Sequence, residues 1–413
     1  MRETIIHAYD VFAERPVELT IRDGKLEAYH PLSPGDGLAN LETLPYVAPG
    51  FFDVQVNGYR GHDFTSPRLT MDDVYEVARE LWQFGVTRFL PTVTTQSREV
   101  LVHCVRTIAQ AVNEFPVLKY GIPGIHLEGP FISFQDGPRG AHPLEHVRAP
   151  NWDEFCHLQE AATGLIRLVT ISPEYETSLS FIEKATQSGV TVAIGHTAAS
   201  PRQIRDAIAA GARLSTHLGN GCHLTLPRHP NYLWEQLAAD DLYASFIADG
   251  FHLPAAFLKT ALRVKGNRAV LVSDLSAMAG LAPGRYSTPL CELEILDDGR
   301  LVVAGQRKLL AGASQPLTTG IINAVALGAV TLRQAVAMAT VTPCEVLDVE
   351  PPRFDTGMPA NLALFDIQEA NENVVTYPPE AGQGDEITGL PTKRINIRAI
   401  YFNSEMWAPA GSR

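Results

Sequence analysis

Four side chains that can bind a metal or move a proton each close a separate short apolar run of this sequence. They are one glutamate, two histidines and one aspartate: Glu128, His196, His217 and Asp274. A carboxylate at the end of a buried strand costs free energy unless a cation meets it. Imidazole nitrogens and carboxylate oxygens bind zinc, and catalytic zinc sites often take three protein ligands. The pattern predicts one divalent ion, expected to be Zn²⁺, held by Glu128, His196 and His217.

Asp274 is then available for proton transfer. A divalent cation lowers the pKa of its bound water to about 7, and a nearby carboxylate can take up the proton and return it to a leaving group. Each residue also has a structural alternative. A histidine that closes a strand is often a hydrogen-bonded core residue, a buried glutamate can pair with an arginine, and an aspartate after a strand can cap a helix. The coincidence of four such residues favours the metal centre.

Strands that alternate with helices must position these side chains. The expected strands are 51–57, 86–94, 120–128, 166–172, 190–196, 212–217, 243–249 and 269–274. The expected helices between them are 70–84, 97–114, 151–162, 176–188, 200–210, 230–240 and 254–265. Eight such repeats predict a (β/α)₈ TIM-like barrel, whose catalytic groups sit at the carboxyl ends of the strands. A doubly wound sheet is disfavoured because no glycine-rich dinucleotide turn follows an early strand.

The two chain ends have a different pattern. Short strands flank a turn at residues 22–25, and alternating apolar residues return near the C-terminus. We expect a small β-sandwich domain from residues 1–48 and 355–413, with the metal-dependent barrel inserted as residues 49–354. Inside that barrel segment, a hairpin is expected at 293–303 and two helices at about 316–328 and 331–340.

Composition narrows the class of protein. The 413 residues include 45% apolar and 19% charged residues, enough for a sizeable core. The net charge of −13 argues against partners such as nucleic acid or an anionic membrane surface. No run approaches the roughly 18 apolar residues of a membrane span, and no secretory signal is visible. The five cysteines are odd in number and form no CxxC motif, which predicts reduced thiols and a cytoplasmic location.

Several motifs resemble, in order and spacing, the N-acetylglucosamine-6-phosphate deacetylases of the amidohydrolase superfamily. The most specific of them is the stretch His126-Leu127-Glu128-Gly129-Pro130-Phe131. The others lie at residues 49–58, 195–197, 216–218, 248–252 and 273–274. The resemblance implies metal-dependent hydrolysis of the acetamide of N-acetylglucosamine 6-phosphate, giving glucosamine 6-phosphate and acetate.

The first barrel strand departs from many superfamily members, which carry His-x-His there and bind two metals. This chain has Gln55, Val56 and Asn57, and neutral amides are poor zinc ligands. The resemblance to members with Gln-x-Asn therefore implies a single metal. Asp53 is expected to order the end of this strand and is given no catalytic role.

The resemblance also implies substrate contacts. His252 would meet the acetamido carbonyl and stabilise the developing oxyanion, and His142 would be a further contact. Asn220 and the Gly221 amide would bind phosphate, while Arg228 would reach the phosphate held by a neighbouring subunit, which implies a homodimer. The alternatives are a loop histidine bonded to the backbone for His252 and a solvated surface arginine for Arg228.

The segment after His217 departs from the family pattern of an aromatic residue followed by Asn-Ala-Met. It contains Gly219 and Cys222, and we expect Cys222 to line a pocket rather than bind metal. This difference leaves a second hypothesis open, in which the substrate is another N-acyl amino sugar, such as the 6-phosphate of N-acetylgalactosamine or an unphosphorylated sugar. A third hypothesis is a metal-free binding protein on the same scaffold.

Overall fold

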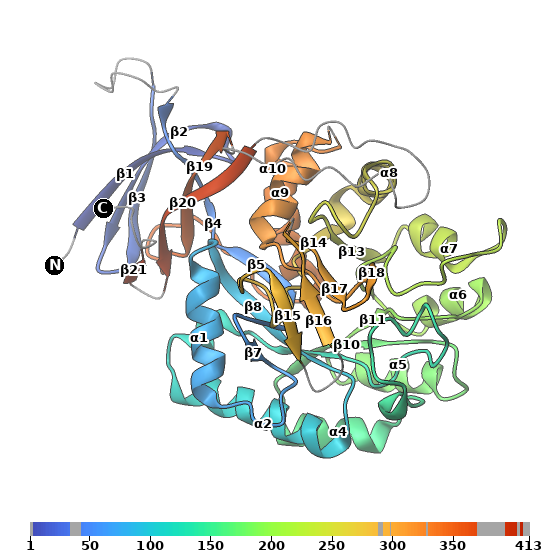
Figure 1. Cartoon of the computed structure of the whole chain (residues 1–413). Coiled ribbons are helices and arrows are strands. Elements are labelled where there is room, and N and C mark those ends of the chain that lie inside the picture. Colours follow the sequence, from blue (N-terminus) through green and yellow to red (C-terminus); the bar gives the residue numbers. More distant parts are fainter. Residues whose placement is uncertain are drawn as a thin grey trace.

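Eight parallel strands form a nearly closed barrel in the computed structural model (Figure 1). The structure describes residues 3–33, 43–287, 292–297, 299–327, 329–369, 393–402 and 405–407. The barrel strands are β5 (Phe51–Val56), β8 (Val86–Thr94), β9 (Ile125–Glu128), β10 (Ile166–Ile171), β11 (Thr191–Ile194), β12 (Leu214–Ser215), β13 (Tyr243–Ile247) and β14 (Ala269–Val272). They follow one another around the sheet in chain order, which confirms the predicted barrel.

The first and last barrel strands meet through the residues that follow β14. The Asp274 backbone N–H donates to the Gln55 carbonyl at 3.0 Å. The Ser273 N–H donates to the Asp53 carboxylate at 3.2 Å. These bonds bring the end of β14 beside the end of β5, so residues more than 200 positions apart in the sequence share one edge of the barrel.

Helices cover the outside of the barrel, as the alternating pattern predicts. They are α1 (Met71–Trp82), α2 (Arg98–Glu114), α3 (Leu118–Gly121), α4 (Trp152–Ala161), α5 (Ser178–Gln187), α6 (Pro201–Ala209), α7 (Tyr232–Ala238) and α8 (Ala255–Lys265). The predicted N-terminus of α6 is confirmed, because the Ser200 side chain accepts from the Gln203 N–H and proline follows at the first helical position. The predicted strand 120–128 is wrong at its start, where α3 makes a helical turn that ends at Gly121.

Segments from both chain ends build one separate seven-stranded sheet. Its strands are β1 (Glu3–Asp10), β2 (Arg15–Arg22), β3 (Lys25–Pro31), β4 (Tyr46–Pro49), β19 (Leu362–Glu369), β20 (Lys393–Phe402) and β21 (Glu405–Trp407). The order is β21-β20-β19-β4-β1-β2-β3, so the N- and C-terminal strands meet where β4 pairs with β19. The predicted β unit from both ends is confirmed, while its boundaries at 48/49 and 354/355 stay a prediction.

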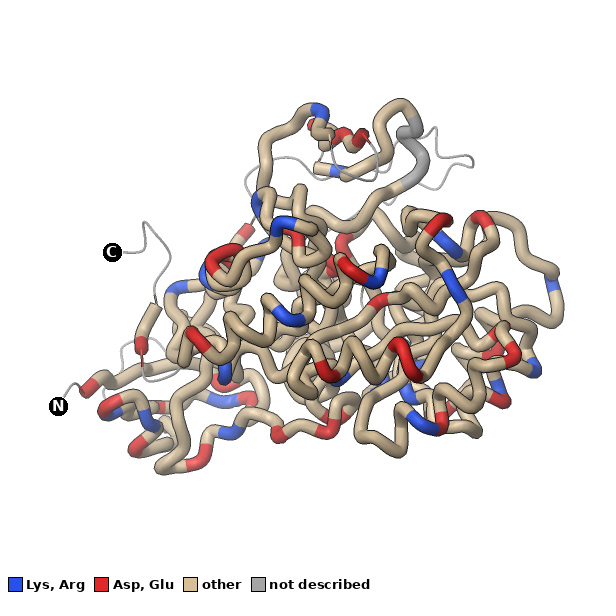
Figure 2. Tube along the Cα trace, turned by 90° about the horizontal axis from the view of Figure 1, so that it is seen from below, with Lys and Arg blue, Asp and Glu red and all other residues tan. Residues whose placement is uncertain are grey.

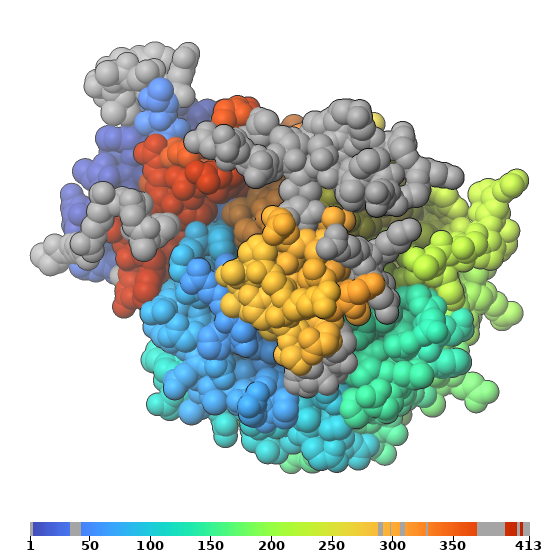
Figure 3. Space-filling view, viewed as in Figure 1, coloured from blue at the N-terminus to red at the C-terminus, as the bar shows by residue number. Residues whose placement is uncertain are grey.

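A four-stranded antiparallel sheet follows β14, where only a hairpin was expected. It contains β15 (Gly284–Ser287), β16 (Glu292–Ile295), β17 (Leu301–Val303) and β18 (Gln306–Leu310). Figure 3 shows this segment in yellow and orange on the surface of the molecule. Three helices come next: α9 (Leu317–Ala326), α10 (Leu332–Met338) and α11 (Val341–Leu347). The first two were predicted and α11 was not.

Charged residues of both signs are interspersed along the trace in Figure 2, and the acidic ones exceed the basic ones in the whole sequence by 46 to 33. Among the residues that the structure describes, none of the helices has the length and hydropathy needed to cross a membrane.

Candidate metal centre and surrounding site

Three predicted ligands converge at the carboxyl ends of β9, β11 and β12. His196 Nε2 lies 3.2 Å from Glu128 Oε1 and 3.1 Å from His217 Nε2. His217 Nε2 lies 3.0 Å from the same glutamate oxygen. All three residues are buried. Tetrahedral coordination with bonds of about 2.0–2.2 Å would place ligand atoms roughly 3.3–3.6 Å apart, a few tenths of an ångström more than the spacing found here.

The tautomer of His196 fits a ligand role. Its Nδ1 lies 2.9 Å from the Pro138 carbonyl oxygen, which can only accept, so Nδ1 carries the proton. In the neutral ring Nε2 then has a free lone pair directed at the other two donor atoms. Backbone partners of this kind are typical of metal-bound histidines. The donor set and its spacing fit a divalent cation.

Electrostatics favours an ionised Glu128. Burial alone would raise the pKa of its carboxyl, but the close contacts with the His196 and His217 rings outweigh that effect and hold the pKa well below its usual range. Burial in turn lowers the pKa of His217, and the bond to Glu128 more than reverses this shift. Glu128 is therefore the negatively charged member of the ligand set.

Three of the strand-ending residues have left-handed backbone conformations: φ is +47° at His196, +29° at His217 and +53° at Asp274. Such values are uncommon outside glycine, and histidine and aspartate adopt them more readily than most residues. Backbone bonds hold each turn, for example from the Ser133 N–H to the His196 carbonyl at 2.9 Å and from the Asn220 N–H to the His217 carbonyl at 2.9 Å. These turns direct the side chains at the strand ends toward the same site.

Two amides on the first strand hold the two carboxylates. The Gln55 side chain donates to Glu128 Oε1 at 2.9 Å, and the Asn57 side chain donates to Asp274 Oδ1 at 2.7 Å. Burial, and then the charge on Glu128, raise the pKa of Asp274 to about 6. Asp274 thus lies in the same electrostatic environment as the cluster and has a pKa suited to accepting and releasing a proton near neutrality.

Asp53 precedes Gln55 on β5 and is fully buried. Its carboxylate accepts from the Ser273 N–H at 3.2 Å and from the Gln55 N–H at 3.3 Å. Both donors are adjacent to site residues, so Asp53 orders the strand ends, as expected from the sequence. Burial raises the pKa of Asp53 to about 7.

His252 is held by a local turn after β13. Its Nδ1 lies 2.8 Å from Asp249 Oδ2, and both side chains are almost fully buried. Burial lowers the pKa of His252, but the charges of Asp249 and Asp274 raise it above its usual value. Asp249 was not among the residues predicted from the sequence, although the Asp-Gly-x-His spacing could have indicated this contact.

Two loops close over the His196 ring. His142 packs edge-on against it at a centroid distance of 4.4 Å and is bonded through Nδ1 to the Thr95 hydroxyl at 2.8 Å. A Cβ added to Gly221 would lie 2.8 Å from His196 Nδ1, and Gly221 has a φ of +55°. The glycine therefore permits a backbone approach that a side chain would obstruct.

The remaining predicted contacts are less enclosed. Asn220 is half-buried, and its side-chain nitrogen is buried without a hydrogen-bond partner. Arg228 is exposed on the loop beyond it, and no contact with the metal-ligand cluster is found. Cys222 is half-buried, with its thiol directed to the Gly219 carbonyl at 3.3 Å, so it does not join the three ligands.

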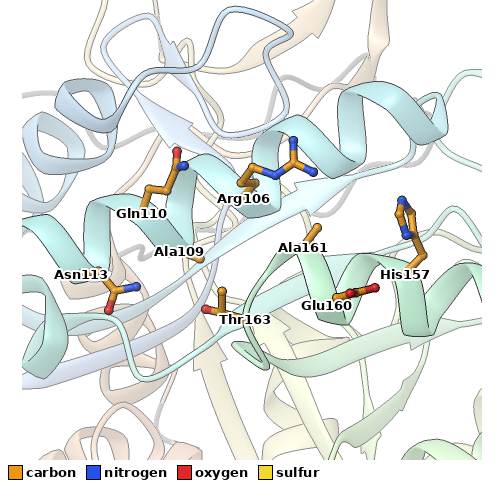
Figure 4. A pocket seen from close by; sticks show the side chains of 8 residues that line it. All are labelled: Arg106, Ala109, Gln110, Asn113, His157, Glu160, Ala161 and Thr163. Atoms are coloured by element: carbon orange, nitrogen blue, oxygen red, sulfur yellow. The ribbon is translucent and has the colours of Figure 1, made fainter.

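A separate surface hollow of about 430 Å³ lies between α2 and α4 (Figure 4). Arg106, Gln110 and Asn113 line one side, and His157 and Glu160 line the other. None of the predicted site residues contributes to it.

Comparison with known proteins gives the family. The amidohydrolase family pattern matches residues 46–388. N-acetylglucosamine-6-phosphate deacetylase from Homo sapiens is 33% identical over 336 residues, which cover 78% of this chain and 79% of the human protein. N-acetylgalactosamine-6-phosphate deacetylase from a Shewanella species is 32% identical over 303 residues, covering 73% and 74%.

A solved structure agrees with both. It is N-acetyl-D-glucosamine-6-phosphate deacetylase from Mycobacterium smegmatis in complex with N-acetyl-D-glucosamine-6-phosphate. It superposes with a TM-score of 0.82 and 25% identity, covering 98% of this chain and 99% of that one. Sequence pattern, relatives and fold agree that the chain belongs to the amidohydrolase family.

Proposed function

We propose that this chain hydrolyses the acetamide of N-acetylglucosamine 6-phosphate, releasing glucosamine 6-phosphate and acetate. The observation that carries the proposal is the convergence of Glu128, His196 and His217 beside Asp274, in a chain that is 33% identical over 336 residues to an enzyme of that name. Buried polar and charged groups are costly unless they are paired, and one divalent cation would pair with all three of these donor atoms at once.

Glu128, His196 and His217 would hold one divalent ion, with Zn²⁺ proposed as its identity because the set combines two imidazoles and a carboxylate. When bound, such an ion supplies Lewis acidity and lowers the pKa of water at the site. Gln55 contributes an amide donor rather than a second set of ligands, which supports a single-metal centre.

Asp274 would act as the proton carrier. It accepts a proton from the attacking water as the C–O bond forms, and it delivers that proton to the amide nitrogen as the C–N bond breaks. The Asn57 amide donates to one of its oxygens at 2.7 Å, and this bond fixes the orientation of the carboxylate. His252 would donate a hydrogen bond to the carbonyl oxygen as negative charge develops there.

Phosphate recognition is proposed for Asn220 and Gly221, with His142 as a further substrate contact. The unpartnered Asn220 nitrogen supports a polar ligand at that loop. Arg228 is exposed and far enough along the loop to serve a partner subunit, which supports a homodimer. A cytoplasmic location is proposed because the four described cysteines, Cys104, Cys156, Cys222 and Cys344, are all free thiols.

The decisive variant is Asp274→Asn, which removes the proton acceptor and keeps the side-chain volume. We expect kcat for acetate release to fall by roughly 10²- to 10⁴-fold, the usual contribution of a general acid–base group. Metal content, measured on the same preparation, should stay unchanged because the three ligands are intact. Full activity in this variant would exclude Asp274 from the mechanism.

A related substrate is also favoured by a specific observation, since relatives near 30% identity include N-acetylgalactosamine-6-phosphate deacetylases. The test is to compare kcat/KM for the two sugar phosphates and for the two unphosphorylated sugars. The proposal expects N-acetylglucosamine 6-phosphate to be preferred. A higher value for the galactose epimer would assign that substrate, and equal values with and without phosphate would remove the role of Asn220 and Gly221.

A further inference from the structure

Asp249 and His252 form a closed unit at the carboxyl end of β13. Asp249 Oδ1 accepts from the backbone N–H groups of Phe251 at 2.8 Å and His252 at 2.9 Å. Oδ2 lies 2.8 Å from the His252 ring nitrogen Nδ1. The side chains are only 4% and 9% exposed. The carboxylate that holds the turn through one oxygen therefore also orients the ring through the other.

The charge state of the unit follows from which groups can donate. An ionised carboxylate only accepts, so the proton between Asp249 and His252 sits on Nδ1. A neutral ring in this tautomer would present a lone pair at Nε2, which repels an oxygen atom. His252 can donate from Nε2 to a carbonyl oxygen only as the imidazolium, with protons on both nitrogens.

We propose that Asp249 is a positioning residue, which keeps His252 doubly protonated and oriented so that Nε2–H donates to the substrate carbonyl oxygen. This inference rests on the function proposed above, because it explains how His252 can perform the role assigned to it there. The same logic applies to any histidine whose orienting carboxylate sets both tautomer and charge.

The surroundings of the unit agree with this assignment. Among the described residues, Asp249, Asp274 and His217 have the largest electrostatic effects on His252. The two carboxylates favour the imidazolium, and His217 opposes it. Burial raises the pKa of Asp249, but His252 outweighs it and holds that pKa below its usual range. The strand end is fixed separately, because the Asn323 amide donates to the Ala248 carbonyl at 2.7 Å.

The chain supplies a matched control at the other end of the molecule. Asp10 is also buried, and its Oδ1 accepts from the N–H groups two and three residues later, at 2.7 Å and 3.0 Å. Its Oδ2 accepts from the Tyr29 hydroxyl instead of a histidine. Asp10→Asn therefore reproduces the structural disturbance of Asp249→Asn without touching the site.

In Asp249→Asn, the amide oxygen can keep the two backbone bonds, which turns its NH₂ group toward Nδ1. The ring should then become neutral, with its proton on Nε2. We expect kcat/KM for acetate release to fall by roughly 10- to 100-fold, less than the roughly 100- to 1,000-fold loss of a whole oxyanion donor. The alkaline limb of the pH profile, where the wild type loses the His252 proton, should disappear. Asp10→Asn should leave both unchanged.

The direct readout is nitrogen NMR of ¹⁵N-histidine-labelled, zinc-loaded protein, with the His252 signals assigned from His252→Asn. At pH 7 the wild type should show an imidazolium at His252, and Asp249→Asn should show the neutral ring protonated at Nε2. A neutral His252 in the wild type would overturn the inference, even if the variant fails to fold. So would an alkaline limb that is the same in Asp249→Asn as in the wild type.

A double variant separates orientation from a general structural role. If Asp249 acts through His252, then Asp249→Asn should reduce kcat/KM very little further in a His252→Asn background. An additive loss would contradict this. If the wild type releases acetate from none of the sugars, the proposed function fails, whereas the NMR measurement still tests the Asp249–His252 unit.

Discussion

The inside of the barrel has two halves that are built in opposite ways. One half is an apolar cluster in which Phe52, Leu90, Leu168 and Leu214 pack together and contact residues of α11. The other half, at the carboxyl ends of the strands, gathers the ligand triad, Asp274 and His252. The side chains of the apolar half pack against one another. In the polar half, some buried polar atoms, including His217 Nδ1, have no hydrogen-bond partner among the described residues.

A narrow polar layer separates the halves. The His126 ring lies 2.8 Å from the Thr170 hydroxyl, which lies 2.7 Å from the Thr216 hydroxyl. These side chains hydrogen-bond to one another across three strands. Along each strand, only one or two residues separate the apolar core from the site residues. We therefore expect mutations in the apolar half to change stability and mutations in the polar half to change metal binding.

Glu128→Gln should have the largest effect, because it removes the negative charge from the ligand set. We expect metal affinity to fall by at least the roughly 10- to 100-fold seen for loss of an outer-shell partner, and acetate release to fall with it. Metal content after dialysis is the measurement, and Glu145→Gln, at an exposed position, is the control. Unchanged metal content would remove Glu128 from the ligand set.

Leu168→Ala tests the apolar half, where we expect a loss of stability without a loss of metal. Leu168 is fully buried among large side chains, so truncation should lower the free energy of unfolding by about 2–5 kcal/mol. Metal content of the folded protein should stay the same. Urea unfolding gives the first quantity and metal analysis the second, with Val264→Ala as an exposed control. Loss of metal without loss of stability would show that the halves are not independent.

Asp53→Asn should give the smallest effect, visible as a change in pH dependence. The folded-state pKa of Asp53 is raised to about 7 from 3.8, so its stabilising contribution is present at low pH and is lost as pH rises through about 7. The wild type should therefore lose stability between about pH 4 and pH 7, and the variant should lose less. Thermal unfolding at both pH values measures this, and identical slopes would contradict the shift.

Sequence patterns predicted most of the barrel because its signals are local. Apolar runs, caps such as Ser200 and the polar residue that ends each run are encoded within a few positions. The error at residues 120–121 arose because α3 has only four residues, too few to show a helical periodicity in the sequence. The sheet β15–β18 was reduced to a hairpin because its first strand, β15, is largely exposed and shows no clear alternation of buried residues.

The sequence by itself determined which residue types end the strands, how many strand–helix units follow one another, and hence which side chains could share the catalytic face. Only the tertiary structure decided how those side chains are held. The Pro138 carbonyl sets the tautomer of His196 across 58 residues, and Asn57 aims Asp274 across 217. Periodicity specifies local elements and their faces, whereas such contacts depend on strand register and barrel closure, which bring distant backbone and side-chain atoms within hydrogen-bonding distance.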